Sequence, residues 1–77
     1  MSADEIPTIE TSDGTIKLGQ FLKLANLAES GAHARELIVG GDVKVDGEVD
    51  TRRSRQLTTG MLVEVLLPDG TLAARVG

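Results

Sequence analysis

KLGQFLKLANLA, residues 17–28, carries its apolar side chains at the spacing of an amphipathic helix. They recur at i, i+3, i+4 and i+7, at Leu18, Phe21, Leu22 and Ala25. Lys23 falls on the opposite face, so we expect it to point into solvent. The same pattern predicts that the buried stripe is widened by Leu24, Leu27 and Ala28.

A second helix is predicted after Ser30, whose hydroxyl suits an N-cap. It should run over residues 32–38 and end at Gly40-Gly41. Neither helix can hide its apolar stripe alone, so we expect the two to pack together. The buried edge of the second helix is predicted to be Ala34, Leu37 and Ile38.

A hairpin follows the helices, and the length of its loop decides its register. A two-residue Asp46-Gly47 loop would pair Lys44 with Val49 and mix apolar and charged residues on both faces. A three-residue loop pairs Val43 with Val49 and turns both valines toward the helices. We therefore favour the three-residue loop.

The rest of the chain predicts two further strands, at residues 61–67 and 71–76, joined by a Pro-Asp-Gly turn. The fold class is α+β, with two packed helices, helix-turn-helix-like, against a small, mainly antiparallel twisted sheet. Residues 1–14 are expected to be an N-terminal arm that is flexible or forms one short strand at residues 8–11. Residues 15–77 are expected to form a single domain.

The composition describes a small acidic protein of 77 residues with a net charge of −4. It has no cysteine, which excludes disulfides, thiolate metal sites and cysteine nucleophiles. Phe21 is its one aromatic residue, so the core should be aliphatic. No apolar run approaches about 18 residues and no leader-like segment opens the chain, so we expect a cytoplasmic protein without a membrane span.

The candidate catalytic residues do not combine into an active site. His33 is the single histidine and lacks partners for a metal set. The acids Asp46, Glu48 and Asp50 lie beside a turn and are interpreted as solvated surface charges. We therefore predict a protein that is not an enzyme and that needs no cofactor or metal.

The basic residues point instead to nucleic acid. Arg52, Arg53 and Arg55 lie together directly after the hairpin, and guanidinium groups suit phosphate. The amides at the start of the second helix also suit a phosphate. Gly31 there either lets a phosphate approach or only permits close packing of the helices. Without an exposed aromatic side chain, binding would depend on phosphates, ribose hydroxyls and the shape of a folded RNA.

Four segments together carry a family resemblance: residues 16–24 (IKLGQFLKL), 29–31 (ESG), 43–47 (VKVDG) and 51–55 (TRRSR). The chain resembles the RNA-binding domain named after small-subunit ribosomal protein S-four, and most of all its small free-standing bacterial members of the YbcJ and YaaA type. The resemblance implies the alpha-L arrangement of two helices on a small sheet. It also implies an RNA-binding face made of Lys23, Ser30, Gly31, His33, Arg35, Lys44, Arg52, Arg53 and Arg55.

Two positions depart from the family pattern. The family often begins its first helix with Arg-Leu-Asp, where this chain has Lys17-Leu18-Gly19. The basic loop often continues with a lysine, where this chain has Gln56. These departures weaken the resemblance slightly, so we expect a modest affinity, although the face remains recognisable.

The sequence thus predicts a monomeric, non-enzymatic protein that docks on structured RNA, either ribosomal RNA or an assembling ribosome. One alternative stays open: a protein–protein interaction module without direct RNA contact, which would use the acidic N-terminal arm and the sheet edge. A ribosomal or other protein partner is compatible with both. A detached domain of an RNA-modifying enzyme is disfavoured, because no catalytic aspartate in a suitable motif is evident.

Overall fold

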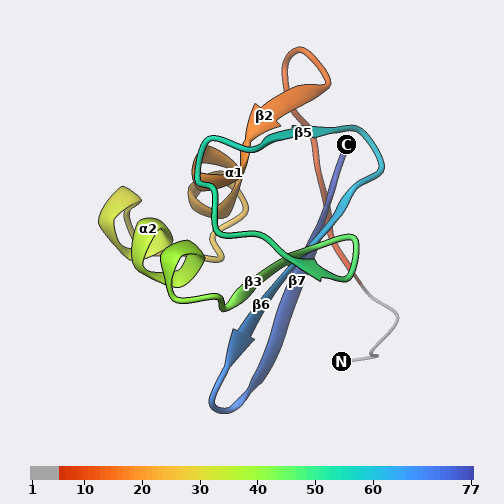
Figure 1. Ribbon diagram of the computed structural model, residues 1–77. Coiled ribbons are helices and arrows are strands. Elements are labelled where there is room, and N and C mark those ends of the chain that lie inside the picture. The colour runs from red at the N-terminus through yellow and green to blue at the C-terminus, as the bar shows by residue number, and fades with distance from the viewer. Residues whose placement is uncertain (1–5) are drawn as a thin grey trace.

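The computed structural model describes residues 6–77 and has two helices lying on one side of a five-stranded sheet (Figure 1). The sheet has the order β1-β7-β6-β3-β4, and a separate two-stranded ribbon joins β2 to β5. This confirms the predicted α+β class. The elements are β1 (Thr8–Ile9), β2 (Thr15–Lys17), α1 (Leu18–Leu24), α2 (Gly31–Val39), β3 (Val43–Val45), β4 (Glu48–Val49), β5 (Gln56–Thr58), β6 (Leu62–Leu67) and β7 (Gly70–Val76).

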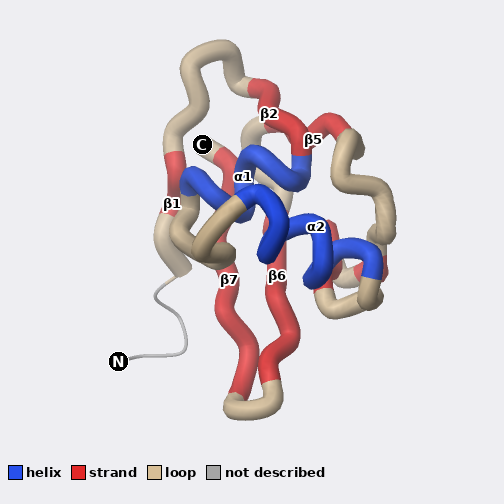
Figure 2. Tube along the Cα trace, turned by 90° about the vertical axis from the view of Figure 1, so that its left-hand side faces the viewer, coloured by secondary structure: helices blue, strands red, loops and turns tan. Residues whose placement is uncertain are grey.

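The sheet is mainly antiparallel, as predicted. The β4–β3, β3–β6 and β6–β7 pairs are antiparallel, whereas β1 and β7 pair in parallel. Figure 2 shows the β6–β7 hairpin extending past the helices. Of the predicted N-terminal arm, residues 8–9 form the short strand β1, while residues 1–5 lie outside the described part of the chain.

Helix α1 is shorter than the predicted helix over residues 17–28. It ends at Leu24 because Asn26 adopts the left-handed conformation, with φ 60°. The Asn26 amide then donates to the Lys23 carbonyl (3.1 Å) and the Leu27 amide to the Leu22 carbonyl (2.8 Å). These two bonds are those of a Schellman motif, which satisfies the last carbonyls of a helix. Leu24, the last residue of α1, is 54% exposed instead of buried, which corrects the prediction.

Helix α2 agrees with the sequence prediction at its start, its end and its buried edge. The Ser30 hydroxyl accepts a hydrogen bond from the His33 amide (3.1 Å), as an N-cap does. The helix ends at Val39, before Gly40 and Gly41, and Gly41 has a φ of 80°. The predicted buried side chains, Ala34, Leu37 and Ile38, are all in the core.

The register of the β3–β4 hairpin differs from the prediction. Lys44 pairs with Val49 through a two-residue loop, in which Asp46 has φ 50° and Gly47 has φ 88°. Positive φ at both positions is the type I′ turn, which matches the twist of paired strands. The Asp46 amide donates to the Leu62 carbonyl (2.8 Å), and the Leu62 amide donates to Asp46 Oδ1 (2.9 Å). The turn is therefore fastened to the start of β6, which the local sequence does not reveal.

The two-residue loop changes which valines are buried. Val43 and Val45 face the core, while Val49 is 53% exposed and does not face the helices as predicted. Lys44 lies between the two buried valines of β3 and is therefore on the opposite face of the sheet. The core itself is aliphatic around the fully buried Phe21, as the composition predicts.

Candidate functional site

The loop that follows β4 is held on the first turn of α1 by main-chain hydrogen bonds. The Leu18 amide donates to the Arg55 carbonyl (2.8 Å) and the Gly19 amide to the Arg53 carbonyl (3.0 Å). Amides in the first turn of a helix have no partner within the helix, and no side chain caps α1. The loop carbonyls supply the missing acceptors, so the path of the loop is fixed relative to α1.

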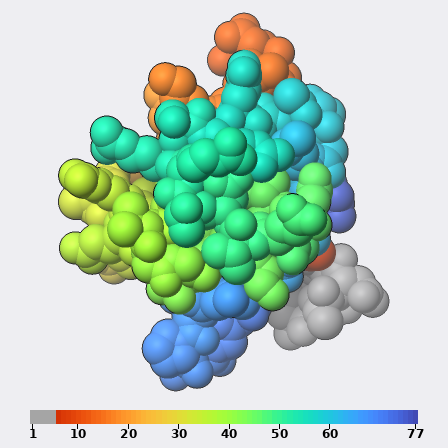
Figure 3. Space-filling model, in the orientation of Figure 1, coloured from red at the N-terminus to blue at the C-terminus, as the bar shows by residue number. Residues whose placement is uncertain are grey.

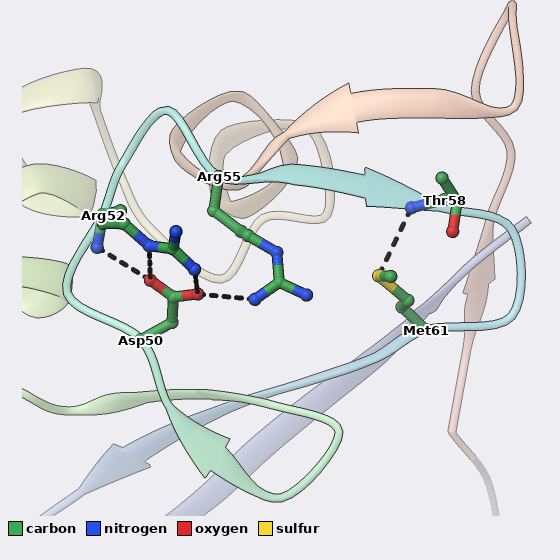
Figure 4. Close-up of polar contacts among 5 residues, drawn as sticks. All are labelled: Asp50, Arg52, Arg55, Thr58 and Met61. Carbon is green, nitrogen blue, oxygen red and sulfur yellow. Dashed lines mark hydrogen bonds and ion pairs between the residues drawn. The ribbon is translucent and has the colours of Figure 1, made fainter.

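A buried carboxylate organises the side chains of the same loop. The side chain of Asp50 is 6% exposed and accepts hydrogen bonds from Arg52 Nε (3.1 Å), Arg52 Nη2 (3.0 Å) and Arg55 Nη1 (2.8 Å) (Figure 4). It also accepts from the Arg52 amide (2.9 Å). The interpretation of Asp50 as a solvated surface charge is therefore wrong. Its own amide bonds to the Val43 carbonyl (3.1 Å), which turns the side chain inward beside β3.

The electrostatics of this cluster follow from its hydrogen bonds. Those from the Arg52 side chain hold the pKa of Asp50 far below its usual range, although burial acts in the opposite direction. In return, Asp50 raises the pKa of the Arg52 guanidinium. One carboxylate against two guanidinium groups leaves one positive charge, and the Arg52 side chain remains 67% exposed. The cluster thus offers less free cationic charge than its arginines alone suggest.

The third arginine of the loop lies in a different environment. Arg53 lines a hollow of about 400 Å³ together with Lys17 of β2, Lys23 of α1 and Arg35 of α2. We call this the cationic hollow. All four cations are exposed, no acidic residue is among those that line it, and the ion pairs of residues 6–77 are confined to Asp50. In Figure 3 the loop (teal) lies beside α2 (yellow-green).

The geometry of the cationic hollow favours an anion. Four like charges in one concave surface raise the local positive potential, even on a protein whose net charge is −4. Gly31 also lines the hollow, and a Cβ at Gly31 would meet nothing within 4 Å. The alternative that Gly31 permits close packing of the helices is therefore wrong. Its lack of a side chain leaves the start of α2 open to the hollow.

The remaining predicted site residues do not line this hollow. The hydroxyl of Ser30 is used as the N-cap, and His33 Nδ1 accepts a hydrogen bond from the Glu29 amide (3.0 Å). Lys44 lies on the opposite face of the sheet, opposite Glu64 of β6. The structure therefore brings together Lys23, Gly31, Arg35 and Arg53, ties Arg52 and Arg55 to Asp50, and keeps the other three away from the hollow.

Lys17 belongs to the hollow and was absent from the predicted site. Its position in the sequence, directly before the helix that carries Gln20 and Lys23, was the available signal. Within residues 6–77, no group of three or more acidic or histidine side chains could hold a metal ion. None of the helices in that range has the length and hydropathy needed to cross a membrane.

Comparison with known proteins assigns the family. The S4 domain model matches residues 9–73, so the chain belongs to the S4 domain family and the predicted resemblance is confirmed. A Bacillus subtilis protein named "Probable ribosome maturation protein RlbA" is 46% identical over 50 residues, which are 65% of this chain and 70% of that protein.

Two further relatives differ in how much of their own length the likeness covers. An Escherichia coli protein named "Putative RNA-binding protein YbcJ" is 44% identical over 48 residues, 62% of this chain and 69% of that protein. A tyrosine–tRNA ligase of Ralstonia nicotianae is 38% identical over 60 residues, which are 78% of this chain but 15% of the ligase. The likeness thus extends from small proteins to one part of a large enzyme.

Proposed function

We propose that this protein is a non-enzymatic, monomeric RNA-binding protein of the cytoplasm that docks on structured RNA through the cationic hollow. Ribosomal RNA, free or in an assembling ribosome, is the proposed target. The observation that carries the proposal is the convergence of Lys17, Lys23, Arg35 and Arg53 on one hollow without a carboxylate. The names of two relatives, one an RNA-binding protein and one a ribosome maturation protein, support it.

The mechanism is the neutralisation of successive phosphates. Arg35 and Arg53 can each grip two phosphate oxygens with their planar guanidinium groups, while the two lysines act as point charges. Phe21 is fully buried, so no aromatic side chain is available on which a base could stack. Affinity would therefore come from phosphates and ribose hydroxyls and from the fit to a folded RNA.

The other residues of the predicted face take secondary roles in this proposal. Arg52 is exposed enough to reach a phosphate while it stays bonded to Asp50, and Arg55 mainly holds the loop. Ser30 and His33 act by fixing the first turn of α2, whose open amides near Gly31 face the ligand. Lys44 lies outside the contact surface, on the other face of the sheet.

The salt dependence of binding tests the mechanism. If about four phosphates are neutralised, log affinity for a stem-loop of ribosomal RNA should fall with log salt concentration with a slope of about −3 to −4. Arg53→Gln should weaken binding to every structured RNA and make the slope shallower by about 1. Fluorescence anisotropy over a salt series measures both quantities.

Arg75→Gln is the matched control for Arg53→Gln. It removes the same charge from an exposed arginine of β7 that bonds the Gly60 carbonyl (2.9 Å) and lies outside the cationic hollow. It should leave the slope unchanged. An affinity that does not respond to salt, or equal losses from both substitutions, would contradict the proposed function.

A further inference from the structure

A second hollow adjoins the cationic one and differs from it in chemistry. It has a volume of about 530 Å³ and is lined by Asp13, Ile16 and Leu24, among others. Gln20 and Lys23 line both hollows, so the two share a wall on α1. We call the second one the Asp13 hollow. Its volume lies in the range of small-ligand sites.

The lining of the Asp13 hollow does not suit a phosphate. The Asp13 carboxylate would repel an anion, and only Lys23 brings a positive charge. Leu24, 54% exposed, and the partly buried Ile16 provide an apolar surface instead. A group that fits here has N–H groups that donate to the carboxylate and an apolar surface for Leu24 and Ile16.

The position of Asp13 is supported by the neighbouring loop. The Gly14 carbonyl accepts a hydrogen bond from the Thr59 amide (3.1 Å), and Gly14 turns the chain with a φ of 73°. These contacts hold the segment between β1 and β2 against the end of β5. The carboxylate is thus carried by an anchored turn, which is what selective recognition of a base edge needs.

We propose that the Asp13 hollow binds the base of one unpaired guanine whose adjoining phosphate lies in the cationic hollow. This inference rests on the proposed function. Two carboxylate oxygens match two adjacent N–H donors, and guanine alone among the four RNA bases presents such a pair, N1–H and N2–H, on its Watson–Crick edge. Leu24 and Ile16 contact the face of the base and the ribose. Lys23, between the hollows, meets the connecting phosphate.

The test uses a short RNA stem with a single bulged nucleotide, in four versions that differ only in the bulged base. All four carry the same number of phosphates, so the cationic hollow contributes equally to each. We expect the bulged guanine to bind about tenfold more tightly than bulged uracil or adenine, as a bidentate base contact provides. Anisotropy titrations at one salt concentration measure the ratio.

Asp13→Asn should reduce that ratio to below about twofold, because the carboxamide turns an N–H donor toward a donor of guanine. Asp69→Asn is the matched control: it removes the same charge from the exposed turn between β6 and β7, and the guanine preference should persist. Leu24→Ala should weaken binding of the bulged guanine and leave the unbulged stem unaffected. Leu24 is exposed, so this substitution leaves the core intact.

The outcomes separate this inference from the proposed function. Equal, salt-dependent binding of all four bulged stems would overturn the guanine site and leave the phosphate mechanism standing. A guanine preference that survives Asp13→Asn would also overturn it. Failure of every stem to bind would overturn both proposals together.

Discussion

Asp50 shows how one side chain changes the meaning of a cationic segment. Three arginines within four positions indicate a phosphate site when the sequence is considered alone. In the folded protein two of them are bound to a carboxylate whose side chain is 6% exposed, and Arg53 is the one of the three that lines the cationic hollow. The loop therefore divides its arginines between holding its own structure and lining the hollow.

The ion pairs of Asp50 should make the stability of the protein depend on pH. The pKa of Asp50 is lowered in the folded state relative to its ordinary value of about 3.9, so its contribution is present at neutral pH and is lost as the pH falls below about 4. Asp50→Asn should cost about 1–3 kcal/mol at pH 7, because it leaves guanidinium hydrogen bonds poorly satisfied. Its thermal midpoint should also fall less steeply with acid than that of the parent.

Thermal melts of both proteins between neutral and acidic pH provide the measurement. Asp69→Asn, on an exposed turn, should melt like the parent at pH 7. Parallel acid dependence in the parent and Asp50→Asn would show that this carboxylate does not carry the expected linkage.

At the scale of the element, the ends of the helices illustrate what local sequence encodes. The Ser30 cap and the Gly40-Gly41 stop were predictable because each depends on residues within one turn of the helix. The end of α1 at Leu24 was not, since apolar spacing continues through Leu27 and Ala28 while Asn26 has already left the helical conformation. Helical periodicity persists in a sequence beyond the point at which a left-handed residue ends the helix.

The C-terminus of α1 yields a direct test. Asn26→Ala should destabilise the protein by about 1 kcal/mol, since the short polar side chain of asparagine tolerates a φ of 60° better than that of alanine. Asn26→Gly, which removes the Cβ altogether, should be neutral or slightly stabilising. Urea unfolding of the two variants compares the free energies of unfolding. Equal stabilities for the alanine and glycine variants would contradict the Schellman assignment.

The predicted register of the β3–β4 hairpin was wrong for a different physical reason. Its register was argued from a consistent face of valines, whereas Asp46-Gly47 forms the two-residue type I′ turn that this dipeptide favours. Two hydrogen bonds between Asp46 and Leu62, which are 16 residues apart, fasten that turn to β6. With this register, Val49 is exposed to solvent. Contacts of this range cannot be inferred from the hairpin alone.

For the whole molecule, net charge was a poor guide to surface chemistry. The chain is acidic overall, yet folding gathers four cations from separate segments around one hollow. The face implied by the family resemblance included three of these, Lys23, Arg35 and Arg53. It did not include Lys17, whose place depends on β2 leading directly into α1.

Association of the whole protein with ribosomal particles can be tested in cell extracts. The protein should sediment with ribosomal particles at low salt and be released by ribonuclease or by raised salt, because its contacts are to phosphates. Arg53→Gln should be released at a lower salt concentration than Arg75→Gln. Association that survives ribonuclease would favour the alternative of a protein–protein interaction module.

The basic loop is attached to α1 through the carbonyls of Arg53 and Arg55, not through their side chains. Its route over the surface is consequently indifferent to which residues occupy positions 53 and 54. Both positions line the cationic hollow, so we expect that substitutions there change its chemistry while the scaffold beneath keeps its shape.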